Sequence, residues 1–354
     1  MMAGGRGITC RARPVSTKLI KETTVKNDQA LATRTIAATP VAALGFGCMS
    51  LSNVYGKSDD RDGVALIREA LDRGITMLDT SDMYGFGHNE MLVGEAIAGR
   101  RGEVFLATKF GNLAGRGGKI ADGRPEFVIE SCEASLKRLG VDVIDLYYQH
   151  RIDPTVPVED TVGAMASLVK SGKVRFLGIS EARGDTIRRA RAVHPIAAVQ
   201  NEYSLLYRVE AEETLQTTRE LGITFVAYSP LGRGLMTGKI EDAATLADGD
   251  ARKRHPRFAE ANLATNLDLV RRLETVAGRR NCTLGQLALA WLLAQGPDVI
   301  PIPGTKRSER LAENIGALAV ELTADDLAEI SAAVPPGAGA GLRYPEAQMQ
   351  SVYL

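Results

Sequence analysis

The stretch ITMLDTSDMYG at residues 75–85 shows the pattern on which the rest of the chain is built. A short apolar run ends in one polar residue, Asp79, and Tyr84 follows five positions later in the loop. The runs VFLATK and VIDLYYQH end in the same way, in Lys109 and His150. Near-continuous apolar runs are typical of strands buried on both faces of a parallel sheet. Because parallel strands present their carboxyl ends at one face, these four side chains are predicted to converge there.

The same alternation of apolar run and helical segment continues along the chain from Leu44 onward. The expected strands are 44–47, 75–79, 104–109, 143–150, 174–180, 197–201, 223–229 and 299–304. The expected helices are 60–73, 88–98, 125–139, 158–171, 183–193, 211–221, 265–279, 283–295 and 307–316. Eight strand–helix units in one chain predict an α/β fold, a closed (β/α)8 TIM barrel in a single domain.

A doubly wound open sheet is the rival architecture. It usually carries a GxGxxG turn after its first strand, and the corresponding GFGCMS does not match. The barrel is therefore favoured and is expected to cover residues 33–335, with residues 336–354 as a C-terminal tail. Residues 1–32 are basic and weakly periodic, which predicts a disordered extension. An organellar transit peptide is the alternative for residues 1–30.

The composition argues against several classes of partner. Lysine plus arginine is 43 and aspartate plus glutamate is 43, so the 354-residue chain lacks the basic excess typical of nucleic-acid or anionic-membrane binding. No apolar run approaches the roughly 18 residues of a membrane span. The 4 cysteines form no CxxC pair, which argues against a zinc site or a disulfide framework. A cytoplasmic protein without a metal site is expected.

The four polar residues together suit the transfer of one proton. Free tyrosine has a pKa of about 10, and the ammonium of Lys109 is expected to lower it. Asp79 can keep Lys109 charged and oriented, while His150 can donate to a carbonyl oxygen. Tyr84 would protonate that oxygen as negative charge develops on it. None of these side chains is a good hydride source, so the electrons must come from a cofactor.

Several segments now resemble, in the same order, motifs of the aldo-keto reductase family. These segments are LDTSDMYGFGHNE (78–90), ATKF (107–110), LYYQHRID (146–153) and IPIPGTKRSERLAEN (300–314). Within that family the chain looks closest to microbial and plant members that carry YYQHR and AYSPLGRG. The resemblance implies a (β/α)8 barrel that reduces aldehydes or ketones with NADPH. The catalytic tetrad that it implies is Asp79, Tyr84, Lys109 and His150.

The resemblance also suggests how NADPH would be held. Ser180 and Gln200 match residues that hydrogen-bond the carboxamide, and Tyr228 matches the aromatic residue that stacks on the nicotinamide. Lys306 and Arg310, one turn apart where a helix begins, are predicted to bind the 2′-phosphate. The full cofactor set is Asp79, Ser180, Gln200, Tyr228, Ser229, Pro230, Leu231, Gly232, Arg233, Gly304, Thr305, Lys306, Arg310, Glu313 and Asn314. Glu181 departs from the pattern, because family members often have asparagine after that serine.

The substrate is expected to be a small carbonyl compound of undetermined identity. The predicted pocket residues are Tyr55, Tyr84, Phe86, Phe110 and His150, beside the segment 111–124. A monomer and a homo-oligomer both remain open. The alternative function is a cofactor-sensing regulatory subunit similar to potassium-channel β subunits, which also retain the tetrad.

Overall fold

One sheet of eight parallel strands organises the chain in this computed structural model, which describes Met1, residues 30–114 and residues 119–354. The strands are β3 (Phe46–Gly47), β4 (Met77–Asp79), β5 (Phe105–Phe110), β6 (Ile144–Gln149), β7 (Val174–Ser180), β8 (Ile196–Glu202), β9 (Thr224–Tyr228) and β10 (Val299–Pro301). Each strand pairs with the next one along the chain. The predicted extension lies almost wholly outside the described residues.

The first and last strand segments meet and close the barrel. The amide of Gly45 donates to the carbonyl of Pro301 at 3.0 Å, and the amide of Gly47 donates to Pro303 at 3.2 Å. The backbones approach so closely that a Cβ atom at Gly304 would lie 2.6 Å from the carbonyl oxygen of Gly47. Only glycine fits such a seam. The predicted (β/α)8 barrel is confirmed.

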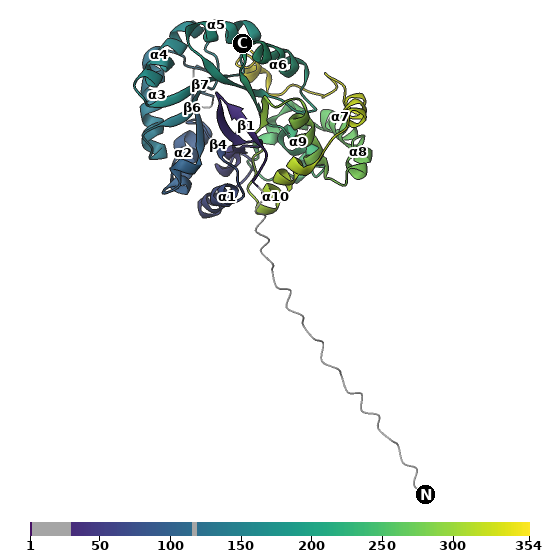
Figure 1. The fold of residues 1–354 in the computed structure, drawn as a ribbon. Coiled ribbons are helices and arrows are strands. Elements are labelled where there is room, and N and C mark those ends of the chain that lie inside the picture. The colour runs from purple at the N-terminus through teal and green to yellow at the C-terminus, as the bar shows by residue number, and fades with distance from the viewer. Residues whose placement is uncertain (2–29, 115–118) are drawn as a thin grey trace. The chain divides into compact units, whose positions relative to one another are not determined.

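Helices surround the strands (Figure 1). They are α1 (Asp60–Asp72), α2 (His88–Ile97), α3 (Pro125–Leu139), α4 (Val158–Lys170), α5 (Gly184–Val193), α6 (Val209–Leu221), α7 (Glu260–Arg271), α8 (Glu274–Arg279), α9 (Leu284–Ala294), α10 (Ser308–Gly316), α11 (Ala324–Ala333) and α12 (Glu346–Met349). Pro125 begins α3 and Gly140 caps it with a φ of 64°, as its sequence predicts. The single helix expected at 265–279 is two helices, α7 and α8. None of the described helices has the length and apolar character that crossing a membrane requires.

A hairpin that the strand periodicity did not reveal lies before the barrel. Its strands are β1 (Thr33–Ile36) and β2 (Thr39–Ala42), paired antiparallel. Ile36 and Val41 are buried in one apolar cluster with residues of the strand interiors, such as Met77 and Phe105. The hairpin also bonds the amino ends of the strands, since the Ala42 amide donates to the Thr76 hydroxyl at 2.8 Å. It therefore closes the amino-terminal end of the barrel and leaves the other end for the site.

The C-terminal segment 341–354 returns to the carboxyl ends of the strands. The amide of Leu354 donates to the carbonyl of Glu181 at 3.0 Å, and the amide of Arg183 donates to the carbonyl of Leu354 at 2.8 Å. Both partners lie in the segment 181–183, between β7 and α5. The predicted tail is thus part of the face on which the polar strand ends lie.

Candidate active site

Lys109 is the centre of the predicted proton-transfer set. It lies one residue before the end of β5, and its side chain is fully buried. Its ammonium donates to Asp79 at 2.5 Å, to the carbonyl of Thr80 at 2.7 Å and to the Tyr84 hydroxyl at 3.1 Å. An ammonium has three donors, so all three are used. Because the Tyr84 oxygen accepts from Lys109, its own O–H is left to donate elsewhere.

Burial and charge set the ionisation of the pair. Burial alone would lower the pKa of Lys109, but the attraction of Asp79 reverses this and the pKa of Lys109 is raised. Burial also raises the pKa of Tyr84, and the Lys109 ammonium only opposes that rise. Lys109 acts on the tyrosine pKa in the expected direction, but burial outweighs it, so the pKa of Tyr84 lies above its usual value and not below it. At neutral pH, Tyr84 is a protonated phenol beside a charged ammonium.

His150 follows β6 and flanks the tyrosine. The two rings meet edge to face, with their centroids 5.8 Å apart. Burial, then the charges of Arg151 and Lys109, holds the pKa of His150 well below its usual 6.5. Its Nδ1 lies 3.1 Å from the hydroxyl oxygen of Ser81. Among the acceptors around the Ser81 hydroxyl, Nδ1 is the nearest, at 3.1 Å against 3.3 Å for Asp82 and 3.4 Å for the carbonyl of Lys109. We therefore assign the Ser81 hydroxyl as the donor to Nδ1, which leaves the single proton of the neutral imidazole on Nε2.

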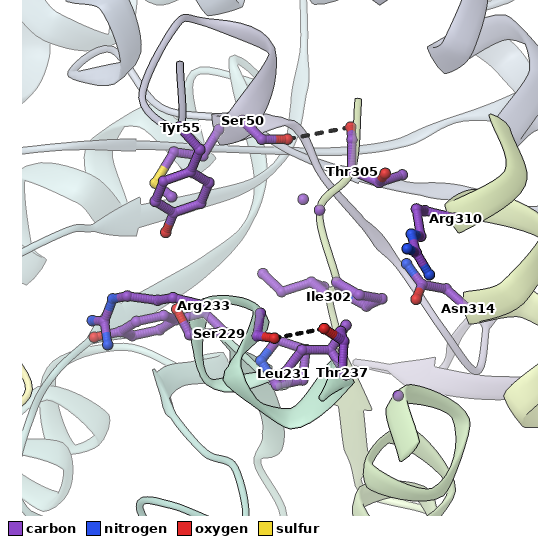
Figure 2. A pocket seen from close by; sticks show the side chains of 18 of the residues that line it. Ser50, Tyr55, Ser229, Leu231, Arg233, Thr237, Ile302, Thr305, Arg310 and Asn314 are labelled. Carbon is purple, nitrogen blue, oxygen red and sulfur yellow. Dashed lines mark hydrogen bonds between the residues drawn. The ribbon is translucent and has the colours of Figure 1, made fainter. Parts of the chain in front are cut away.

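A cavity of about 410 Å³ opens beside Asp79 and Tyr84. Figure 2 shows Arg310 and Asn314 on one side of it and Tyr55 and Arg233 on the other. The predicted cofactor residues that border it are Asp79, Gln200, Tyr228, Ser229, Pro230, Leu231, Arg233, Gly304, Thr305, Arg310, Glu313 and Asn314. The structure therefore brings most of the predicted cofactor set to one cavity.

The residues predicted to bind the nicotinamide carboxamide include one with a buried hydroxyl that is unpaired in the described part of the chain. Ser180, the last residue of β7, has a buried hydroxyl oxygen without a hydrogen-bond partner among the described residues. Gln200 donates to Asp79 at 2.8 Å, which fixes its amide. Tyr228 donates to Glu181 at 2.7 Å, which holds its ring at the cavity. A buried hydroxyl without a partner is expected to find one in a ligand, so these residues fit a carboxamide.

Lys306, predicted to bind the 2′-phosphate, and Arg233, another predicted cofactor residue, both use their charges elsewhere in the fold. The Lys306 ammonium donates to the carbonyls of residues 55, 56 and 57, at 2.8, 3.2 and 2.9 Å, so it holds that loop instead. The guanidinium of Arg233 is buried against Glu202, with a shortest distance of 3.0 Å. Arg310 and the exposed Arg307, which the sequence analysis did not single out, border the cavity beside the start of α10. Gly232 and Lys306 are not among its lining residues.

A second cavity of about 450 Å³ shares Tyr55, Tyr84, Gln200 and Tyr228 with the first. Phe86 and His150 border it, and so does Ser180. Phe110 does not: it is fully buried and stacks on Tyr147 with their centroids 5.0 Å apart. Successive strand side chains point to opposite faces, so Lys109 inside the barrel places Phe110 outside, against the helices. The prediction that Phe110 lines the substrate pocket is wrong.

The contacts of Glu181 account for a glutamate at the position where asparagine is expected. Its backbone is left-handed, with a φ of 56°, a region in which asparagine is common. Its carboxylate accepts two bonds from Arg343, each 2.8 Å long, and both side chains are buried. The next residue, Tyr344, borders the second cavity and lies 3.0 Å from the Tyr228 hydroxyl. Neither Arg343 nor Tyr344 could be recognised from the sequence, because Arg343 lies 162 positions from its partner Glu181 and Tyr344 directly follows it.

The sequence profile of the Aldo/keto reductase family matches residues 43–335. The chain belongs to the aldo/keto reductase family.

Similar proteins cover nearly the whole of this aldo/keto reductase. It is 50% identical over 310 residues to a probable aldo-keto reductase 1 of Glycine max, covering 86% of this chain and 88% of that protein. It is 44% identical over 329 residues to the NADP(+) aldo-keto reductase yakc of Schizosaccharomyces pombe, covering 91% and 97%.

Solved structures agree with the fold. The glycerol dehydrogenase of Gluconobacter oxydans has a TM-score of 0.77 at 30% identity and covers 86% of this chain and 96% of its own. An aldo/keto reductase of Klebsiella pneumoniae, solved in complex with NADP and acetate, has a TM-score of 0.68 at 26% identity and covers 90% and 99%.

Proposed function

We propose that this aldo/keto reductase reduces aldehydes or ketones to alcohols with NADPH. One observation carries the proposal: Lys109 bonds both Asp79 and Tyr84 at the point where the two cavities meet. A cofactor in the first cavity and a carbonyl compound in the second would therefore meet at the tyrosine hydroxyl. The NADP(+) named for the Schizosaccharomyces relative and the NADP of the Klebsiella structure support the choice of cofactor.

The side chains divide the proton transfer among themselves. His150 is neutral and Lys109 is a charged ammonium tied to Asp79, so Tyr84 is the residue with a proton free to give. Tyr84 donates its proton to the carbonyl oxygen, and the ammonium stabilises the phenolate that remains. The Nε2 proton of His150 holds the same oxygen in place. Bound NADPH would supply the hydride that none of these residues can supply.

Residues of the first cavity, together with Ser180 of the second, would hold NADPH along its length. Ser180 and Gln200 would bond the carboxamide, and Tyr228 would stack on the nicotinamide ring. Arg310 and Arg307 would bind the 2′-phosphate, helped by the free amides at the start of α10. Arg310 is already oriented by its bond to Glu313.

The proposal is tested by NADPH oxidation with a panel of aldehydes and ketones, using the wild type and Tyr84→Phe. We expect turnover by the wild type and a loss of kcat of about a hundredfold or more in the variant, because general acid catalysis contributes roughly that much. The dissociation constant for NADPH should stay within about threefold, since the phenol oxygen bonds only Lys109 among the described residues.

Two outcomes would go against the proposal. Near-normal turnover by Tyr84→Phe would remove the tyrosine from the proton path. Tight NADPH binding with negligible turnover of every carbonyl compound tested would instead favour the cofactor-sensing alternative.

A further inference from the structure

Arg151, the residue after His150, is a buried cation without a carboxylate. It is 6% exposed, and among the described residues no aspartate or glutamate lies within ion-pair distance of it. Its guanidinium donates to the carbonyl of His150 at 2.9 Å and to the Tyr344 hydroxyl at 3.4 Å. Both partners are neutral. Buried charges in proteins are almost always paired, so this arginine is unusual.

Among the described residues, the other buried arginines of this region are paired with carboxylates, unlike Arg151. Each has a carboxylate at 3.0 Å or less, and these pairs are Arg233–Glu202, Arg257–Glu202 and Arg343–Glu181. These three buried arginines therefore each have a carboxylate within ion-pair distance, although Arg233 and Arg257 share Glu202. Arg151 differs from these arginines in a second way, because it borders the second cavity beside the Tyr84 and His150 side chains.

The second cavity has a consistent electrostatic character. Three arginines border it, Arg151, Arg233 and Arg254, and its described lining contains no aspartate or glutamate. Glu202 pairs with Arg233 but also with Arg257, so one carboxylate offsets the charge of two arginines only in part. Arg254 is exposed at the rim and has no ion pair among the described residues. A cleft lined by one sign of charge attracts ligands of the opposite sign.

We propose that Arg151 binds a carboxylate on the substrate, so the substrates are small aldehydes or ketones that carry a carboxylate group. This inference rests on the proposed reductase function and names its substrate class. The planar guanidinium fork matches a carboxylate, and the long bond to Tyr344 is readily exchanged for a charged acceptor. A carboxylate carries the single negative charge that balances one buried arginine. With the carboxylate at Arg151, the carbonyl end of the same molecule would lie at Tyr84 and His150.

The experiment compares matched pairs of aldehydes with the full chain and NADPH. The pairs are para-carboxybenzaldehyde with its methyl ester and succinic semialdehyde with its methyl ester. We expect kcat/KM to favour each acid over its ester by about tenfold or more, as one charge-assisted hydrogen bond does. The preference should appear mainly in KM. A phosphate arm, pyridoxal phosphate against pyridoxal, tests the other common anion.

Arg151 variants assign the preference to this side chain. Arg151→Gln should abolish the acid-to-ester ratio, and Arg151→Lys should restore part of it. The matched control is Arg254→Gln at the rim, where an exposed charge should change the ratio by less than about fivefold. Equal loss for acid and ester in Arg151→Gln would overturn the proposal, because the arginine would then only position His150 or Tyr344. Preference for the phosphate but not for the carboxylates would overturn it as well.

A binding measurement separates this inference from the proposed function. If no aldehyde is reduced, the reductase function fails, and calorimetry with benzoate and benzamide on the chain without cofactor still reports on the site. Benzoate should bind about tenfold or more tightly than benzamide, and Arg151→Gln should remove the difference. Equal binding of the two compounds by the wild type would reject the carboxylate site.

Discussion

At the residue scale, the pairing of Asp79 with Lys109 serves both folding and chemistry. The two side chains are 3% and 0% exposed, so neither charge has access to bulk water. Each charge is tolerated because the other is present, and Gln200 bonds the remaining carboxylate oxygen. Removal of one partner therefore leaves an unpaired buried charge, while removal of both does not.

A double-mutant cycle tests this coupling. Lys109→Met should lower the free energy of unfolding by about 3–5 kcal/mol, because it leaves the Asp79 carboxylate buried with only Gln200 as a donor among the described residues. Asp79→Asn combined with Lys109→Met should lower it by less than the sum of the single changes. Urea unfolding measures the free energy of unfolding of Lys109→Met, Asp79→Asn and the double variant. Strictly additive losses would mean that the two charges are screened from each other in solution.

At the element scale, Lys306 in the turn before α10 and Arg310 within α10 have different roles, although the sequence predicts the same role for both. Lys306 and Arg310 are one turn apart, which predicts a common target. The turn before α10 instead directs Lys306 to the carbonyls of residues 55–57, while Arg310 borders the first cavity. Spacing along a helix gives the face of a side chain, but a residue just before the helix is not bound by that periodicity. The direction of Lys306 could therefore not be predicted.

The division of tasks predicts different effects on the two cofactors. Arg310→Ala should weaken NADPH by about tenfold or more and leave NADH almost unchanged, because only NADPH carries the 2′-phosphate. Lys306→Ala should weaken both cofactors by similar factors, since it frees a loop whose Tyr55 borders both cavities. Dissociation constants for both cofactors with both variants measure this. Selective loss of NADPH in Lys306→Ala would return the phosphate role to that lysine.

The C-terminal segment 341–354 depends on an ion pair that responds to acid. Burial alone would raise the pKa of Glu181, but the Arg343 guanidinium beside it brings the pKa to about 2, against an ordinary 4.5. A carboxylate whose folded pKa lies below its unfolded one contributes stability that is complete above about 4.5 and is lost as the pH falls toward about 2.

Glu181→Gln should therefore lower Tm at neutral pH, and its deficit relative to the wild type should shrink as the pH falls below 4.5. Thermal unfolding across that range measures the difference. The matched control is Glu159→Gln, which removes an exposed pair with Arg189 and should change Tm little at any pH. A deficit that stays constant with pH would mean that the carboxylate charge of Glu181 is not what holds the segment.

At the scale of the whole molecule, near-continuous apolar runs made the eight-strand barrel predictable, because each buried strand leaves the same signature. The hairpin at 33–42 has no such apolar run, since its strands are half exposed. Ile36 and Val41 are its side chains that pack into the apolar cluster inside the barrel. The convergence of Asp79, Tyr84, Lys109 and His150 could be predicted because three of them lie at strand ends and Tyr84 lies in the loop after β4. The place of Phe110 and the Glu181–Arg343 pair could not be predicted, because side-chain facing and long-range ion pairs depend on the assembled fold.

The hairpin sets where the chain can be shortened. A chain beginning at Leu31 should match the full chain in Tm and in kcat/KM. The residues removed are basic, and their few apolar residues show no clear helix or strand periodicity. A chain beginning at Leu44 loses Ile36 and Val41, and burying each such side chain contributes about 1.5–3 kcal/mol. It should unfold at a much lower temperature or fail to fold. Ile36→Ala in the full chain isolates the cause and should cost about 2–5 kcal/mol in urea unfolding. An Ile36→Ala variant as stable as the wild type would show that the hairpin does not close the barrel in solution.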